Sequence, residues 1–149
     1  MSYRVLDYMH QPLLTVDVGS SALAVSKLMA EKGTGYAVVL EKTRPIGMVT
    51  EKDLVIKVMS REKDPSNIRI ADIMSTPLIT VSTGATLEEA VNAMAEHRIR
   101  RLPVVKDNVI YGVFTSRDLT RHFSEYQDRI TKDLINACAL YPHSVALDF

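Results

Sequence analysis

Two short segments of the sequence carry side chains whose types and spacing suit the recognition of a nucleotide. Each segment reads threonine, any residue, a cation and an aspartate, so it supplies a hydroxyl, a positive charge and a carboxylate within four positions. At the start of a helix, a carboxylate can accept both hydroxyls of a ribose, while backbone N–H groups and a cation favour phosphate. These residues are Thr50, Lys52 and Asp53 in the first segment and Thr115, Arg117 and Asp118 in the second.

The same pattern has a structural explanation, which is the simpler one on local evidence. A threonine at the N-cap accepts a hydrogen bond from the backbone of the third helical residue, and an aspartate there can bond back to the cap. Such capping boxes are common, but a cap needs no cation. Because Lys52 and Arg117 stand at the same place in both segments, the sequence slightly favours a cap that also binds a ligand.

Both segments belong to an internal repeat whose two copies are offset by 65 positions. The agreement includes glycine and proline positions, where backbone geometry is demanding, so it indicates two copies of one folded unit. A unit of roughly 60 residues would be only marginally stable alone, because small units bury little apolar surface, and we therefore expect the copies to share a core. Matched pairs are Asp7 with Asp72, Pro12 with Pro77, Gly19 with Gly84 and Gly47 with Gly112.

Each copy is predicted to fold as strand, helix, strand, strand and helix. A lead segment that contains proline favours a short strand. A helix with one apolar face follows, and in the second copy it starts with a capping box at Thr86. Two apolar runs joined by a polar turn then indicate a hairpin. The last helix is clearest over 52–61, with Leu54, Val55 and Val58 predicted on one face.

These patterns divide the chain into two copies, a polar linker and a tail. The tail has no counterpart in the first copy. Within it, Ile130 and Leu134 predict a helix, which a loosely apolar end follows. The predicted boundaries are 5–62 for the first copy, 63–69 for the linker, 70–123 for the second copy and 124–149 for the tail.

The complete double pattern resembles a tandem pair of CBS domains, which is called a Bateman module. The resemblance runs from the lead M-x-x-P-x-x-T-V through HRIRRLPVV to G-h-h-T-x-x-D-L, and it covers residues 5–123. It implies a mixed α/β (α+β) fold, in which two β-α-β-β-α repeats are related by a pseudo-twofold axis and pack through their sheets. It also implies adenosine-containing ligands in clefts between the repeats, and assembly into a homodimer shaped like a flat disc.

The resemblance also assigns two ligand-binding sites by position. Ribose contacts fall on the repeated aspartate and threonine, and adenine contacts fall on backbone groups of the leads and of the segments before the second strands. Because arginine suits phosphate oxygens, the site around Asp118 is expected to be the stronger and more phosphate-selective one. Its predicted residues are Asp118, Thr115, Arg117, Arg100, Arg101, Leu14, Gly35 and Tyr36. The predicted residues of the second site are Asp53, Thr50, Lys52, Ile79 and Arg101.

The composition narrows the classes of function. With 18 basic and 18 acidic residues the net charge is zero, which argues against a nucleic acid or an anionic membrane as partner. The single cysteine fits a reducing cytoplasm, and the sequence has neither a signal peptide pattern nor an apolar run of membrane-spanning length. Its histidine and cysteine spacings predict no metal site, and its motifs predict neither a cofactor nor a catalytic constellation.

The sequence therefore predicts a cytoplasmic regulatory module that senses AMP, ADP or ATP and is not an enzyme. It would signal through the shape of a homodimer or through an effector protein that the sequence does not identify. The open alternatives are S-adenosylmethionine or a dinucleotide as the ligand, or a dimerisation scaffold without a ligand. An enzyme acting on a nucleotide would need a general base, and a nucleic-acid-binding role would rest on HRIRR alone.

Overall fold

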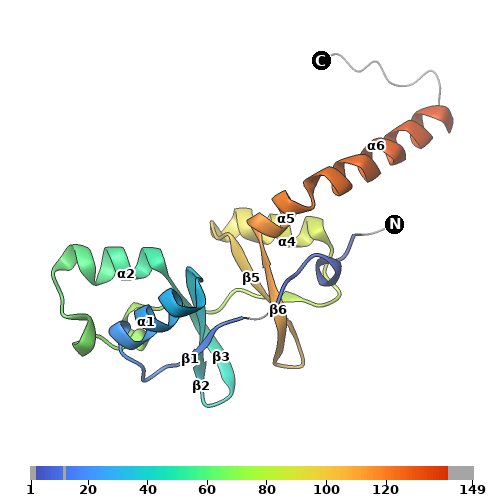
Figure 1. The fold of residues 1–149 in the computed structure, drawn as a ribbon. Coiled ribbons are helices and arrows are strands. Elements are labelled where there is room, and N and C mark those ends of the chain that lie inside the picture. Colours follow the sequence, from blue (N-terminus) through green and yellow to red (C-terminus); the bar gives the residue numbers. More distant parts are fainter. Residues whose placement is uncertain (1–2, 12, 141–149) are drawn as a thin grey trace.

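The computed structural model describes residues 3–11 and 13–140, and these form two three-stranded sheets, one in each repeat (Figure 1). In each sheet the first strand runs parallel to the second, which pairs antiparallel with the third. The predicted mixed α and β fold with two similar repeats is confirmed. The first sheet has the order β1 (Thr15–Asp17), β2 (Tyr36–Glu41) and β3 (Arg44–Thr50), and the second has β4 (Val81–Ser82), β5 (Arg101–Lys106) and β6 (Val109–Thr115).

Two helices accompany each sheet, and each begins at a residue whose side chain caps it. Ser21 caps the first helix, and Thr50, Thr86 and Thr115 form capping boxes in which the third helical residue bonds back to the cap. The first helix ends at Gly33, whose φ of 64° is a left-handed conformation that favours glycine. The helices are α1 (Ala22–Lys32) and α2 (Glu51–Lys57) in the first repeat and α4 (Leu87–His97) and α5 (Ser116–Arg121) in the second.

The second helix of the first repeat is shorter than the sequence pattern predicts. At Val58, with φ −120° and ψ −67°, α2 gives way to a 3-10 turn, η2 (Met59–Arg61). Val58 is buried as predicted, because it lies one turn after Leu54 on the face that meets the core. Val55 lies about 100° around the helix from Leu54. It is 57% exposed and Met59 is 75% exposed, so both lie on the surface.

The lead segment of each repeat, which in the structure comprises the residues before its first strand (5–14 and 70–80), packs on the other repeat. Each hydrophobic core therefore contains residues from both halves of the chain (Figure 1). The 3-10 turn η1 (Val5–Asp7) brings Val5 into the core of the second repeat, beside Leu102 and Phe114. Helix α3 (Ile70–Ile73) in turn contributes its two isoleucines to the core of the first repeat. The two repeats therefore share their cores, as expected, by exchanging their lead segments.

Each lead also pairs with the third strand of the other repeat. The backbone of His10 exchanges two hydrogen bonds with Val113 on β6, at 3.0 and 3.1 Å. The backbone of Ser75 exchanges two with Met48 on β3, at 3.1 and 2.8 Å. Both pairs obey the 65-position offset, so the two places where a lead crosses the other repeat's third strand are equivalent.

A glycine stands on the strand at each crossing. A Cβ atom added to Gly112 would lie 2.7 Å from the carbonyl oxygen of His10, and one added to Gly47 would lie 2.8 Å from that of Ser75. Real Cβ atoms do not approach backbone this closely, so any larger residue must displace the lead. The two matched glycines therefore permit the exchange.

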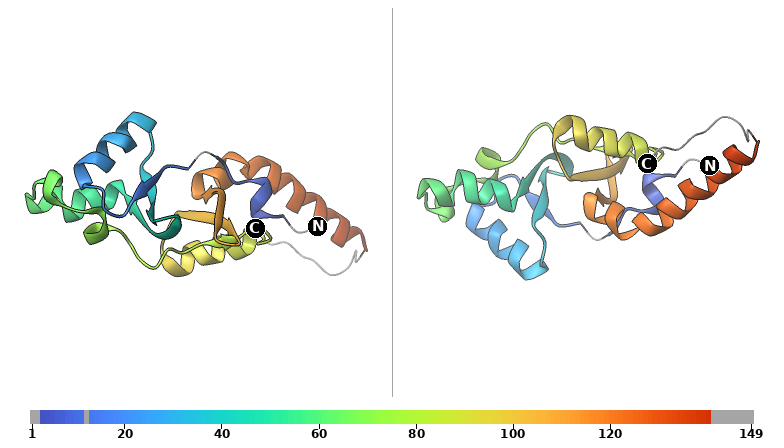
Figure 2. Two further views of the ribbon diagram at one scale, coloured as in Figure 1. Left: turned by 90° about the horizontal axis from the view of Figure 1, so that it is seen from below. Right: turned by 90° about the horizontal axis from the view of Figure 1, so that it is seen from above.

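A long helix, α6 (Phe123–Leu140), extends from the second repeat and away from the two sheets (Figure 2). The tail is helical here as the sequence predicts, and the predicted loose end at 141–149 lies outside the described residues. The guanidinium group of Arg129 on α6 lies 5.3 Å above the ring of Tyr3. In the linker, η3 (Pro65–Asn67) packs against α1. Within the described residues, no helix is both long and apolar enough to cross a membrane.

We predict that Gly112→Ala lowers the free energy of unfolding by about 1–3 kcal/mol, because the added methyl group must push the lead away from β6. Gly84→Ala is the matched control, since its added Cβ would lie 3.7 Å from the nearest atoms. Urea unfolding followed by circular dichroism measures both. Equal free energies of unfolding for the two variants would contradict the role assigned to Gly112.

Candidate functional site

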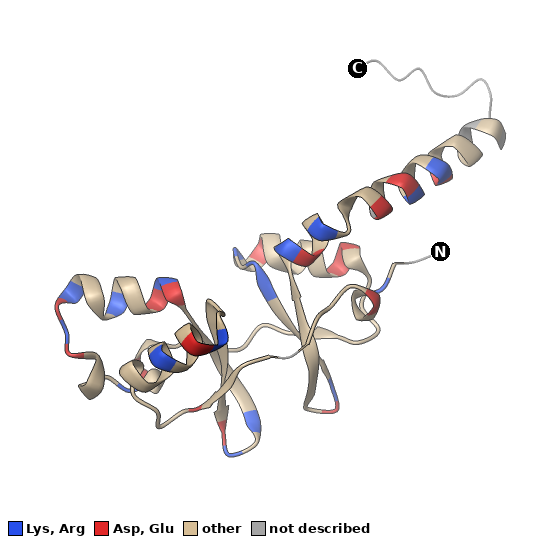
Figure 3. Ribbon diagram, viewed as in Figure 1, with Lys and Arg blue, Asp and Glu red and all other residues tan. Residues whose placement is uncertain are grey.

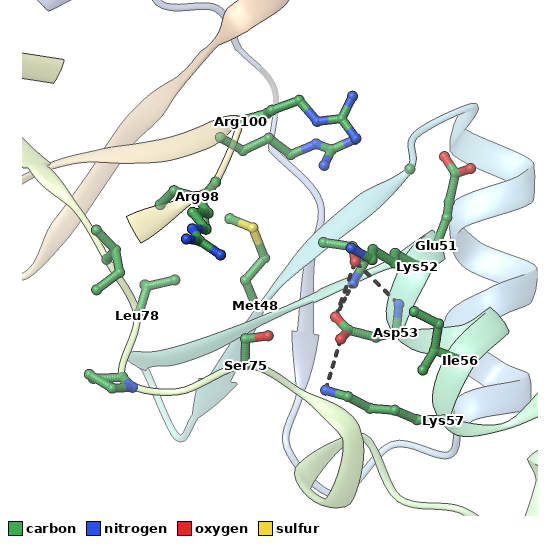
Figure 4. Close-up of a pocket in the computed structure, with 16 residues that line it drawn as sticks. Met48, Glu51, Lys52, Asp53, Ile56, Lys57, Ser75, Leu78, Arg98 and Arg100 are labelled. Atoms are coloured by element: carbon green, nitrogen blue, oxygen red, sulfur yellow. Dashed lines mark hydrogen bonds and ion pairs between the residues drawn. The ribbon is translucent and has the colours of Figure 1, made fainter. Parts of the chain in front are cut away.

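A cleft of about 660 Å³ opens between the two repeats, beside the start of α2 (Figure 4). Small-molecule sites typically have volumes of about 300–1,000 Å³. The first repeat contributes the end of β3 and the start of α2, and the second contributes its lead and the segment before β5. The lining residues are Gly35, Met48, Thr50, Glu51, Lys52, Asp53, Ile56 and Lys57 from the first repeat, and Ser75, Pro77, Leu78, Ile79, Arg98, Ile99, Arg100 and Arg101 from the second.

The capping box of α2 fixes the carboxylate of Asp53 in this cleft. Its Oδ2 accepts hydrogen bonds from the backbone N–H of Thr50 at 2.9 Å and from the Thr50 hydroxyl at 3.1 Å. Its Oδ1 forms an ion pair with Nζ of Lys57 at 2.9 Å (Figure 4). The capping explanation drawn from the sequence is therefore correct. The same bonds hold the carboxylate in one orientation, as ribose recognition requires.

Arginines line the side of the cleft opposite Asp53. Arg98 and Arg100 come from the segment that leads into β5, and Arg101 is the first residue of this strand, where Figure 3 shows a basic stretch. Lys52 adds a cation from α2. Burial lowers the pKa of Arg101 below its usual value, and the neighbouring Arg100 adds to this effect. A guanidinium nevertheless stays charged at physiological pH. This wall suits an anionic group such as phosphate.

The remaining lining of the cleft is largely apolar. Met48 and Ile56 come from the first repeat, and Pro77, Leu78 and Ile79 come from the lead of the second. Apolar surface with a few fixed polar groups is the usual composition of a small-molecule site. The cleft thus combines a surface for a flat ring, a fixed carboxylate and a cationic wall.

The structure brings the residues of the second predicted site together in this cleft. Gly35 and Arg100, which the sequence grouped with Asp118, line the same cleft. Leu14 packs against the first core, and its carbonyl oxygen accepts a hydrogen bond from the N–H of Val38 at 2.9 Å. That these residues bind a ligand stays a prediction. The residues of the second predicted site that line the cleft are Asp53, Thr50, Lys52, Ile79 and Arg101.

Asp118 has the same cap but different surroundings. It is 1% exposed, and its Oδ2 accepts hydrogen bonds from the N–H and the hydroxyl of Thr115, both at 2.9 Å. Nδ1 of His10 lies 2.8 Å from Oδ1 and 2.7 Å from Oδ2. Arg117 lies exposed at the start of α5. Both oxygens of this carboxylate are therefore engaged by the chain itself.

His10 also connects Asp118 to the first repeat. Its other ring nitrogen, Nε2, lies 3.3 Å from the hydroxyl of Tyr36, and the guanidinium of Arg101 lies 4.8 Å above the Tyr36 ring. Burial raises the pKa of Tyr36, with the charge of Arg101 opposing the effect, so the phenol is neutral at physiological pH. A series of contacts thus runs from Asp118 to Arg101 in the wall of the first cleft.

Sequence reasoning missed two residues that contact the aspartates. Lys57 lies four positions after Asp53 on one helix, a spacing typical of an ion pair, so the sequence carried a signal. His10 gave no local signal, because its partner Asp118 is 108 positions away. Only the exchange of the lead segments brings this pair together.

Comparison with protein families matches the CBS domain to residues 5–60 and 70–125. An uncharacterized protein of Methanopyrus kandleri is 40% identical over 120 residues, and the match covers 79% of this chain but only 61% of that relative. Among solved structures, the hexameric CBS-CP12 protein from bloom-forming cyanobacteria has a TM-score of 0.76 at 25% identity, covering 97% of this chain and 87% of that one. A CBS domain protein from Pyrobaculum aerophilum, complexed with AMP, has a TM-score of 0.71 at 26% identity, covering 78% and 89%.

The two matched segments fall on the two repeats that the sequence offset and the paired sheets define independently. Together they cover most of the chain, which confirms the resemblance drawn from the sequence. This chain belongs to the CBS domain family and carries the domain twice.

Proposed function

We propose that this chain is a cytoplasmic regulatory module that binds AMP, ADP or ATP in the cleft beside Asp53. One observation carries the proposal: a carboxylate fixed by the cap of α2 and three arginines line one cleft of suitable volume. The carboxylate suits the ribose hydroxyls, and the arginines suit phosphate oxygens. The relative from Pyrobaculum aerophilum, solved in complex with AMP, supports this class of ligand.

Each part of a nucleotide has a matching surface in the cleft. The Oδ1 atom of Asp53 would accept a ribose hydroxyl beside, or in place of, the ammonium group of Lys57. The apolar side chains around Ile79 would cover the adenine ring, and Lys52 and Arg100 would contact the phosphates. Since the ligand would touch both repeats, its binding would fix their relative position.

The cationic wall also distinguishes between adenosine ligands. S-adenosylmethionine carries a positive sulfonium group, and a like charge near three arginines costs free energy. The phosphates of a nucleotide are attracted by the same groups. We therefore favour a nucleotide over S-adenosylmethionine, while a dinucleotide shares the phosphate chemistry of the proposed ligands.

A binding role fits the side chains of the cleft better than catalysis does. The carboxylate of Asp53 is engaged by Thr50 and Lys57, so it is not poised as a general base. In the part of the chain that the structure describes, no cluster of three or more histidine, cysteine, aspartate or glutamate side chains could hold a metal ion. Regulation then requires that the nucleotide bind one conformation more tightly than another.

We further propose that the module is a homodimer joined through an apolar patch on α2 and η2, and that it signals to an effector protein. Val55, Ile56 and Met59 in this patch are 57%, 45% and 75% exposed. A contiguous exposed apolar patch is typical of an interaction surface. Because Ile56 also lines the cleft, ligand and partner would contact the same helix. The hexameric cyanobacterial relative supports self-association.

Asp53→Asn is expected to weaken nucleotide binding by about tenfold to a hundredfold, because it removes the charged ribose acceptor while keeping the side-chain volume. Isothermal titration with AMP, ADP and ATP measures the change, and Asp128→Asn at an exposed position of α6 is the matched control. Wild-type nucleotide affinity in the Asp53→Asn variant would contradict the proposed site. Chromatography of ATP after incubation with the protein checks that it is bound and not hydrolysed.

Arg100→Ala is expected to lower the affinity for ATP by about tenfold while changing the affinity for adenosine by less than about twofold, because a charged donor to phosphate is lost. Arg121→Ala, at the exposed end of α5, is the matched control. Competition titrations with ATP and with adenosine give, for each ligand, the ratio of the variant's affinity to that of the wild type. Equal losses for ATP and adenosine would show that Arg100 does not act through phosphate.

Met59→Glu is expected to raise the dissociation constant of the homodimer by about tenfold or more, because it places a charge in the apolar contact. Sedimentation equilibrium measures the constant. Val109→Glu is the control, since Val109 is also an exposed apolar residue, at 56%, but lies in the hairpin of the second sheet. A Met59→Glu dimer as tight as that of Val109→Glu would exclude this patch as the interface.

A further inference from the structure

We propose that His10 closes the second nucleotide site, so that the fold holds one open cleft at Asp53 and one site at Asp118 that its own lead segment occupies. The inference rests on the proposed function, because it assumes that the repeated aspartates are the ribose acceptors. It reverses the ranking that the sequence suggests, in which Asp118 marks the stronger site. His10 is therefore the residue that determines which of the two sites accepts a nucleotide.

The carboxylate of Asp118 is more completely covered than that of Asp53. At each aspartate both carboxylate oxygens already have partners, so what matters is how much of the carboxylate a ribose can still reach. At Asp118, Thr115 bonds to Oδ2, and the ring nitrogen of His10 lies within 2.8 Å of both oxygens. The side chain of Asp118 is 2% exposed, whereas that of Asp53 is 11% exposed. An imidazole thus stands where the hydroxyls of a ribose would have to bind.

The first repeat supplies an internal control for the contact between His10 and Asp118. Ser75 is the counterpart of His10 and makes the same backbone pairing with the opposite strand. Its side chain is too short to act as His10 does. Among the described contacts, Asp53 bonds to Thr50 and Lys57, and Ser75 simply lines the open cleft. The lead residue beside the aspartate is thus a histidine at the closed site and a serine at the open one.

His10, and not a residue of α5, contacts the second oxygen of Asp118. In the first repeat the second oxygen of Asp53 pairs with Lys57, from the same helix. The counterpart of Lys57 is His122, whose ring packs edge-on against Tyr8 and whose Nδ1 lies 3.8 Å from Glu125. The partner of Asp118 therefore comes from the lead.

Contacts with both repeats hold His10 in place. Its backbone is fixed by the pairing with Val113, and its Nε2 lies 3.3 Å from the hydroxyl of Tyr36. Both ring nitrogens therefore have partners, one from each repeat. The side chain of His10 is 38% exposed, so the ring is not part of a core. Its removal would uncover Asp118 without leaving a buried cavity.

The first test replaces His10 with serine, the residue at the equivalent position of the second repeat. Isothermal titration and native mass spectrometry then give the number of ATP molecules bound per chain. We expect wild type to bind one ATP per chain, at Asp53. We expect His10→Ser to bind a second ATP, and the added Asp118→Asn substitution to remove it. His97→Ser, at an exposed position at the end of α4, is the matched histidine control and is expected to behave as wild type.

The reverse exchange tests the idea on the other cleft. Ser75→His is expected to weaken ATP binding at Asp53 by about tenfold or more, because an imidazole at this position can reach the carboxylate. Thermal unfolding checks that each variant is folded. Unchanged ATP affinity in a folded Ser75→His protein would count against the inference, and it would do so even if His10→Ser proved unstable.

The outcomes separate the inference from the proposed function. Two sites in wild type, or no additional site in His10→Ser, would overturn the closure by His10. Wild type that binds no ATP would contradict the proposed function at Asp53. Even then, a site that appears in His10→Ser and disappears with Asp118→Asn would support the closure.

Discussion

The fold depends on the close passage of each lead segment over a glycine of the other repeat. At Gly47 and Gly112 the backbones approach so closely that no side chain fits between them. This passage carries η1 and α3 into the opposite cores, so neither repeat has a complete core alone. It also places each lead beside the helix start that bears the other repeat's aspartate. The contacts that complete the cores therefore build the two sites as well.

The capping box serves stability and ligand recognition through the same atoms. In both repeats the threonine N–H and hydroxyl hold one oxygen of the aspartate. A carboxylate held in this way loses little conformational freedom on binding, so the structural cap preorganises the proposed ribose acceptor. The sequence presents a helix cap and a binding site as two explanations of this motif. In the structure, one arrangement of the same atoms is compatible with both.

Local features of the fold could be predicted from the sequence, and non-local ones could not. The capping boxes, the hairpins and the two similar repeats follow from short patterns and from the 65-position offset. The exposure of Val55 was missed because the apolar pattern of a short helix does not show which face meets the core. The contact of His10 with Asp118 depends on the exchange of leads, and no pattern within one repeat contains it.

The two repeats have diverged at positions that surround the aspartates. At equivalent positions of the two copies, His10 corresponds to Ser75, Tyr36 to Arg101, and Lys57 to His122. The first two differences produce one series of contacts, from Asp118 through His10 and Tyr36 to Arg101, whose guanidinium lines the open cleft. A phosphate that draws Arg101 away from the Tyr36 ring would weaken the support of His10. By thermodynamic linkage, release of His10 from Asp118 would then alter the affinity of the open cleft to the same extent.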